Sequence, residues 1–109
     1  LAGKSISGCR ACYRCFETKD GHCAVTGDML NECIDKMRAA DGIILGSPTY
    51  FSDVTAGMKA LIERAGMTAR ANPEILRRKV GAGVVAVDAN YIYVSTGTNT
   101  WKRAALATW

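Results

Sequence analysis

The stretch "DGIILGSPTYFSDV", residues Asp41–Val54, carries the clearest indication of the fold. Its first two residues form a turn, and the run Ile43–Leu45 that follows is continuously apolar rather than alternating. Continuous apolar runs are typical of parallel strands that are covered on both faces. We therefore predict a central parallel strand here, with a loop over Ser47–Asp53 at its carboxyl end.

Helical periodicity appears on both sides of this strand. A helix is predicted over Asp28–Ala40, with Asp28 as its N-cap and a stripe of apolar residues at Leu30, Cys33, Ile34 and Met37. Cys33 is on that stripe and is interpreted as a core residue. A second helix is predicted over Val54–Ala65, with Gly66 in the C′ position after its end.

The remaining elements complete an α/β pattern. Asn72-Pro73 breaks the chain, and Lys79–Val87 is predicted as the next strand. Helix, strand, helix, strand is the order of an α/β domain with a mostly parallel sheet. Farther along, Asn90–Thr96 is predicted as a strand. Thr100–Trp109 is predicted as a short amphipathic helix, since apolar residues recur there every four positions.

Composition excludes several classes of protein. A chain of 109 residues forms one compact domain at most, and its net charge of +4 is scattered apart from the run Arg77–Lys79. That run is interpreted as a solvated helix end, so no nucleic-acid partner is expected. No apolar run approaches the ~20 residues that cross a bilayer, and no export signal opens the chain. We therefore expect no membrane partner and a cytoplasmic location.

Four cysteines form the first candidate site: Cys9, Cys12, Cys15 and Cys23. Three thiols within seven residues can ligate three corners of a [4Fe-4S] cluster, with the fourth thiol supplied from nearby. Zinc is an alternative, with His22 as a substitute for Cys23, and reduced thiols without metal are another. Disulfides are disfavoured because the sequence shows no secretory signal.

The loop Gly46–Val54 is the second candidate site. It follows the carboxyl end of a predicted strand and leads into a helix, which is where open α/β sheets bind ligands. The pair Tyr50-Phe51 offers a planar surface to a flat heterocycle. The alternative is an ordinary strand-to-helix turn whose two aromatic rings fold onto the core.

Together, these segments resemble a known family. The C-x-x-C-x-x-C-x7-C segment, Asp28-Met29 and "ADGIILGSPTYFSDVTAGMKALIER" (Ala40–Arg64) are similar to flavodoxin-like NAD(P)H-dependent FMN reductases, and within them to iron-sulfur flavoproteins. The resemblance covers about Gly8–Val87. It implies an open parallel sheet with helices on both faces, and electron transfer through FMN.

The resemblance also implies the roles of particular residues. FMN contacts are expected from Ser47, Pro48, Thr49, Tyr50, Phe51 and Ser52. The four cysteines are expected to ligate a [4Fe-4S] cluster that passes electrons to the flavin, and no residue is assigned as a catalytic acid or base. The implied partners are a nicotinamide nucleotide or another electron donor, and further copies of the chain in a homo-oligomer.

Members of that family begin with a strand, a phosphate-binding loop and a helix, which we expect this chain to lack. The expected organisation is a single partial flavodoxin-like domain over residues 1–109, with a cysteine-rich segment (1–27), an α/β core (28–87) and a divergent tail (88–109). Two other functions stay open: a non-catalytic truncated α/β module that self-associates or binds a partner, and a zinc-binding module.

Overall fold

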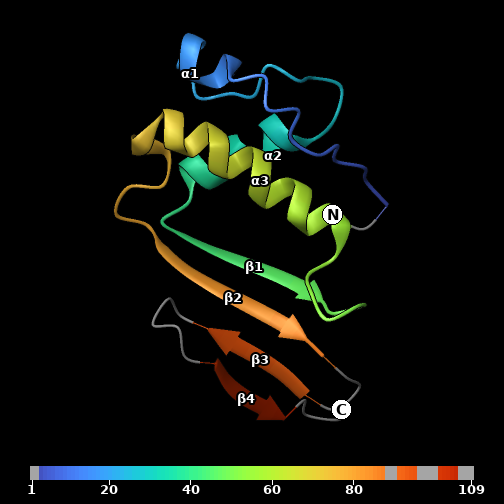
Figure 1. The fold of residues 1–109 in the computed structure, drawn as a ribbon. Coiled ribbons are helices and arrows are strands. Elements are labelled where there is room, and N and C mark those ends of the chain that lie inside the picture. Colours follow the sequence, from blue (N-terminus) through green and yellow to red (C-terminus); the bar gives the residue numbers. More distant parts are fainter. Residues whose placement is uncertain (1–2, 88–90, 96–100, 106–109) are drawn as a thin grey trace. The chain divides into compact units, whose positions relative to one another are not determined.

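The computed structural model describes residues 3–87, 91–95 and 101–105, the last two segments by their backbone alone. The chain divides into two compact units (Figure 1). One contains residues 1–40 and 56–79 and is helical, and the other contains residues 41–55 and 80–109 and holds the sheet. Each unit is described by itself.

Helix α3 is the centre of the helical unit. The unit comprises α1 (Arg14–Thr18), α2 (Leu30–Ala39), α3 (Ala56–Ala71) and the short 3₁₀ helix η1 (Pro73–Ile75). The other three elements all contact α3 (Figure 1). The buried apolar side chains include Leu30 and Ile34 of α2, Leu61 and Ala65 of α3, and Ile75 of η1. Helices α2 and α3 each contribute a pair four residues apart, which places both members on one helical face.

The predicted first helix is confirmed but begins later than expected. Helix α2 starts at Leu30, and its N-cap is Met29, which makes no side-chain capping bond. The Asp28 carboxylate does accept a hydrogen bond from the Leu30 N–H (3.2 Å), but it is also paired with Arg64 of α3. Cys33 is half-buried rather than a core residue, because the unit buries Leu30 and Ile34 instead.

The predicted end of the second helix is wrong. Helix α3 continues through Gly66 to Ala71, and it begins at Ala56 rather than Val54. Its buried face extends past the glycine with Thr68 and Ala69, so packing outweighs the modest helix-breaking tendency of one glycine. The helix stops before Asn72, whose N–H still bonds the Thr68 carbonyl (3.0 Å). The predicted break at Asn72-Pro73 is thus confirmed.

The sheet has the order β1-β2-β3-β4. Its strands are β1 (Gly42–Pro48), β2 (Val80–Ala86), β3 (Tyr91–Ser95) and β4 (Trp101–Ala105). Strands β1 and β2 are parallel, with Gly42 opposite Val80 and Pro48 opposite Ala86, whereas the other two pairs are antiparallel. A parallel pair joined through a helix confirms the α/β class, in agreement with an incomplete flavodoxin-like fold.

Two predictions about the sheet need correction. Strand β1 is not central among the described strands, since it pairs only with β2, and Ile44 is 73% exposed rather than covered. The segment predicted as a helix at the end of the chain contains β4 instead, with Trp101 opposite Ser95 of β3. Pairing with β3 satisfies its backbone groups, which a four-residue spacing does not reveal. Residues 90, 96, 100 and 106–109 lie outside the described residues.

The described helices were also compared with the length and apolar character that a membrane-spanning helix needs. Among the described residues, none of the helices combines enough length with enough apolar character to cross a bilayer.

The continuity of α3 can be tested at Gly66. A Cβ added there would meet nothing within 4 Å, so Gly66→Ala should raise the free energy of unfolding by roughly 0.5–1 kcal/mol. The matched control is Gly27→Ala. Gly27 also has open space but a φ of +97°, so that variant should lose roughly 1 kcal/mol. Urea unfolding measures both variants, and destabilisation by Gly66→Ala would contradict a helical Gly66.

Candidate functional site

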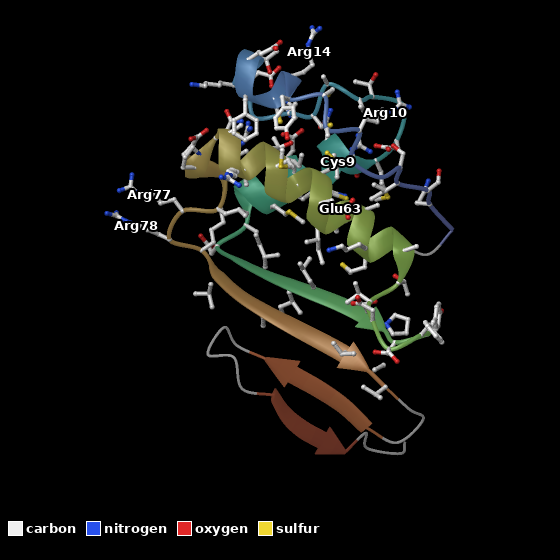
Figure 2. The ribbon with its side chains drawn as sticks, in the orientation of Figure 1. Cys9, Arg10, Arg14, Glu63, Arg77 and Arg78 are labelled. Carbon is white, nitrogen blue, oxygen red and sulfur yellow. The ribbon has the colours of Figure 1, made fainter. Side chains whose placement is uncertain are left out.

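The four predicted ligand cysteines line one cavity in the helical unit. Cys9, Cys12, Cys15 and Cys23 lie along it together with three residues of α3: Arg64, Met67 and Thr68. Figure 2 shows Cys9 on the segment beside Glu63 of α3, and a Cβ added at the neighbouring Gly8 would be 4.0 Å from Glu63 Oε2. The structure therefore brings the cysteine segment onto α3, where sequence spacing alone could only place the thiols near one another.

The backbone of the cysteine segment is wound by residues that are not glycine. Ala11 and Tyr13, one in each gap of the C-x-x-C-x-x-C run, have φ values of +51° and +56°. Left-handed conformations cost roughly 1–2 kcal/mol per non-glycine residue. The Ala11 N–H also donates to Cys9 Sγ (3.4 Å). Unfavourable backbone conformations maintained between ligand candidates are typical of functional loops.

Burial differs among the thiols. Cys15 is buried and its Sγ approaches the Met67 carbonyl oxygen (3.9 Å), Cys23 is half-buried, and Cys9 and Cys12 are exposed. Burial raises the pKa of the Cys15 thiol, a backbone hydrogen bond partly offsets this, and the nearby Cys23, Cys12 and Cys9 raise it further. Thiolates gathered this closely repel one another, so a bound metal centre would stabilise their ionised forms.

Arg64 is the residue of this candidate site that the sequence pattern did not single out. Its side chain is 1% exposed and forms an ion pair with Asp28. Nη1 also donates to the Ser7 carbonyl (3.2 Å), and Nη2 donates to the Val25 carbonyl (2.6 Å) and Cys23 Sγ (3.5 Å). Its spacing in the sequence could have indicated this, because Arg64 follows Leu61 by three residues and so lies on the buried face of α3. An arginine on such a face needs partners.

The Arg64–Asp28 pair is charged at neutral pH. Burial alone would raise the pKa of Asp28, but the hydrogen bonds from Arg64 and from the Ser7 and Leu30 backbone lower it to about 2. Burial likewise would lower the pKa of Arg64, whereas its contacts with Asp28 and Cys23 raise it. Because both ions are paired and hydrogen-bonded, the burial of each is compensated.

Two polar atoms beside the cysteines lack hydrogen-bond partners. In the part of the chain that the structure describes, Arg64 Nε and Thr68 Oγ1 are buried and make no hydrogen bond, and both residues line the cysteine cavity. A buried donor left unpaired costs about 1–3 kcal/mol. These two donors therefore suit a bound group that offers acceptor atoms.

The donor set fits an iron–sulfur cluster in its chemistry. Four thiols are the usual ligands of such a cluster, and its inorganic sulfides supply acceptors for the unpaired donors, which a lone cation does not. Among the described residues, no group of three or more His, Cys, Asp or Glu side chains is arranged around a single metal ion. His22 does not line the cavity; its Nε2 is 2.8 Å from Asp35 Oδ1, so the structure does not support it as a substitute ligand.

The predicted flavin loop belongs to the sheet unit. Ser47 is buried and closes the loop: its Oγ accepts from the Thr55 N–H (3.1 Å) and donates to the Pro48 carbonyl (2.9 Å). Thr49 donates its N–H to the Ala86 carbonyl (2.9 Å) and forms a β-bridge with Val54. These bonds fix both ends of the loop.

The tip of this loop presents its aromatic rings. Tyr50 is 82% exposed and Phe51 is 94% exposed, and Ser52 turns the chain with a φ of +58°. The alternative of two rings folded onto the core does not match these exposures. The loop thus combines a fixed base with an accessible aromatic surface.

The three basic residues of the run Arg77–Lys79, which follows η1, differ in their surroundings. Arg77 and Arg78 are exposed, and Figure 2 shows them pointing outward. Lys79 Nζ instead donates to the carbonyls of Arg38 (2.7 Å) and Ala40 (2.6 Å) at the end of α2. A cation that caps these carbonyls complements the negative end of the helix dipole. The run is therefore solvated only in its first two residues.

The buried ion pair makes the stability of the chain depend on pH. Since the pKa of Asp28 is depressed, its contribution of about 2 kcal/mol is complete above its ordinary pKa and is lost as the pH falls through about 2. Asp28→Asn should lower the free energy of unfolding at pH 7 by at least about 3 kcal/mol, because Arg64 stays buried without its carboxylate.

The difference between wild type and Asp28→Asn should then shrink between pH 4 and pH 2, as measured by urea unfolding at each pH. The matched control is Asp35→Asn, which removes an exposed pair with His22 and should cost less than about 1 kcal/mol. If the difference in free energy of unfolding between wild type and Asp28→Asn does not change with pH, the pairing of Asp28 with Arg64 is contradicted.

Comparison with known proteins shows the family of this chain. The model of a family described as NADPH-dependent FMN reductase matches residues 2–96, a range that extends past Val87. An iron-sulfur flavoprotein of Methanocaldococcus jannaschii is 44% identical over 90 residues, which are 83% of this chain and 44% of that protein. No solved structure matches the chain.

Two further relatives give the same result. Iron-sulfur flavoproteins of Methanosarcina thermophila and Archaeoglobus fulgidus are 37% and 39% identical, over 77% and 78% of this chain. The matches cover 42% and 40% of those proteins, so the chain spans less than half the length of the curated relatives it matches. With a family match over residues 2–96 and this identity, the chain belongs to the NADPH-dependent FMN reductase family.

Proposed function

We propose that this chain forms the cysteine site and part of the flavin site of an FMN-dependent oxidoreductase that carries electrons between a [4Fe-4S] cluster and FMN. The observation that carries the proposal is one cavity that is lined by four cysteines and by two buried donors with no partner among the described residues. The family described as NADPH-dependent FMN reductase, and relatives named iron-sulfur flavoproteins, support it.

In this proposal, Cys9, Cys12, Cys15 and Cys23 hold the cluster, which when bound supplies one-electron chemistry. The residues of α3 prepare the site. Arg64 fixes Cys23 through its Nη2, and Met67 lies against the buried Cys15. Because Cys15 is buried, water is excluded from one side of the cavity, and the electrostatic interactions there are strengthened.

The proposed flavin contacts come from Ser47, Pro48, Thr49, Tyr50, Phe51 and Ser52. Ser47 holds the base of the loop, while the exposed rings of Tyr50 and Phe51 offer faces on which a flat heterocycle can stack. Electron transfer itself requires no acid or base from the protein. A nicotinamide nucleotide is the proposed electron donor because the family description names NADPH.

Self-association and a cytoplasmic location are also part of the proposal. Among the described strands, β1 pairs only with β2, which leaves its other edge with backbone groups able to pair with a further strand. All five cysteines are free, as is usual in a reducing compartment. A non-catalytic module and a zinc-binding module are the outcomes that the experiments below distinguish.

The cysteine site is tested by anaerobic reconstitution of the 109-residue chain with iron and sulfide. We expect a brown protein with about four iron ions per chain, as a [4Fe-4S] cluster requires. Serine replacement of any one of Cys9, Cys12, Cys15 or Cys23 should abolish or sharply reduce iron content and visible absorption. The control is Cys33→Ser, since Cys33 does not line the cavity and this variant should keep both signals.

Elemental analysis of the freshly purified chain separates the alternatives. Zinc in place of iron would indicate the zinc-binding module. A colourless protein that takes up neither iron nor FMN would indicate the non-catalytic module. Equal loss of iron in Cys33→Ser and in the cavity variants would argue against a site made by the four cysteines.

The flavin loop is tested by ring removal at its tip. Tyr50→Ala should weaken FMN binding about tenfold, since stacking of a planar base on an aromatic ring contributes ~1–3 kcal/mol. Tyr50→Phe keeps the ring and should bind FMN like wild type. Quenching of flavin fluorescence measures both affinities, and equal binding by the alanine variant would remove Tyr50 from the proposed site.

A further inference from the structure

Arg64 and Thr68 share one face of α3 beside the cysteines. They are four residues apart in the helix, and each is 1% exposed. Both line the cavity that contains Cys9, Cys12, Cys15 and Cys23. The two residues therefore place polar groups at the same wall of one buried space.

Each residue has one polar atom that the fold leaves unused. Arg64 employs Nη1 and Nη2 in bonds to Asp28, Ser7, Val25 and Cys23, and only Nε has no partner among the described residues. A threonine inside a helix commonly bonds the carbonyl four residues earlier. Thr68 Oγ1 makes no such bond in the described structure. Two buried donors are thus available to an acceptor in the cavity.

We propose that Thr68 Oγ1 and Arg64 Nε donate hydrogen bonds to sulfur atoms of the group that the cysteines hold, and that they thereby raise its reduction potential. This inference rests on the proposed iron–sulfur function. Reduction adds one electron to the bound group and neither forms nor breaks a bond to the protein. Donors directed at its sulfur atoms stabilise the more negative, reduced form.

Thr68 is the better residue to change, because Arg64 also holds the fold together. Thr68→Val replaces the hydroxyl by a methyl group of similar size, whereas Thr68→Ser keeps the hydroxyl and serves as the matched control. Each protein is reconstituted anaerobically with iron and sulfide. It is then titrated with a chemical reductant of known potential while visible absorbance and electron paramagnetic resonance are recorded.

Thr68→Val should lower the equilibrium constant for reduction about tenfold, which is ~59 mV for a one-electron couple. Thr68→Ser should keep the wild-type potential. In the metal-free chain, Thr68→Val should be at least as stable as wild type to urea, because it removes a buried hydroxyl that has no partner. A purely structural role of the hydroxyl would instead destabilise that metal-free variant.

The outcomes separate this inference from the function on which it rests. If the wild-type chain takes up neither iron nor sulfide, both the proposed function and this inference are overturned. Wild type that assembles a cluster whose potential is unchanged in Thr68→Val would overturn the inference alone. Equal shifts in the valine and serine variants would also overturn it, since the serine variant retains the donor.

Discussion

The buried ion pair between Arg64 and Asp28 is the interaction on which the helical unit depends. It joins residues 36 positions apart, and the same guanidinium reaches Ser7, 57 positions away. An isolated buried charge is prohibitively unfavourable, so Arg64 requires these partners in place. Through them, the irregular segment before α2 is fixed onto α3. The cysteine cavity exists because this segment, which has little regular structure, is attached in that way.

The chemistry of the cavity follows from the same attachment. A free thiol segment could adopt many conformations, whereas here one thiol is buried, one contacts Arg64, and two remain exposed. The wall formed by α3 adds the Arg64 guanidinium, which is paired with Asp28, and two donors that have no partner in the described part of the chain. In the proposed site, the sulfide acceptors of a bound cluster would pair with these two donors. The two donors and the four cysteines are the features on which the proposed cluster site rests.

The predicted flavin loop, Gly46–Val54, is organised on a different principle. Its ends are fixed by short bonds within the sheet unit, from Ser47 to its neighbours and from Thr49 to Ala86. Its aromatic tip makes no use of the core, because Tyr50 and Phe51 are almost fully exposed. Because the two ends of the loop are already fixed, the loop loses less conformational entropy when it binds a ligand. In the proposed function, a flavin stacked on these exposed rings would remove part of their apolar surface from water.

The sequence by itself determined the α/β class, the strand before the loop Gly46–Val54 and the break at Asn72-Pro73, because these depend on local periodicity and spacing. The spacing of the four cysteines also anticipated that they lie together, and the structure places them along one cavity. It misplaced the end of α3 and the structure of Trp101–Ala105, where packing across Gly66 and pairing with β3 outweigh local patterns. Only the tertiary structure placed Arg64 and Thr68 at the wall of the cysteine cavity. Their burial there and the bonds of Arg64 depend on contacts between residues distant in the chain, which no short-range pattern records.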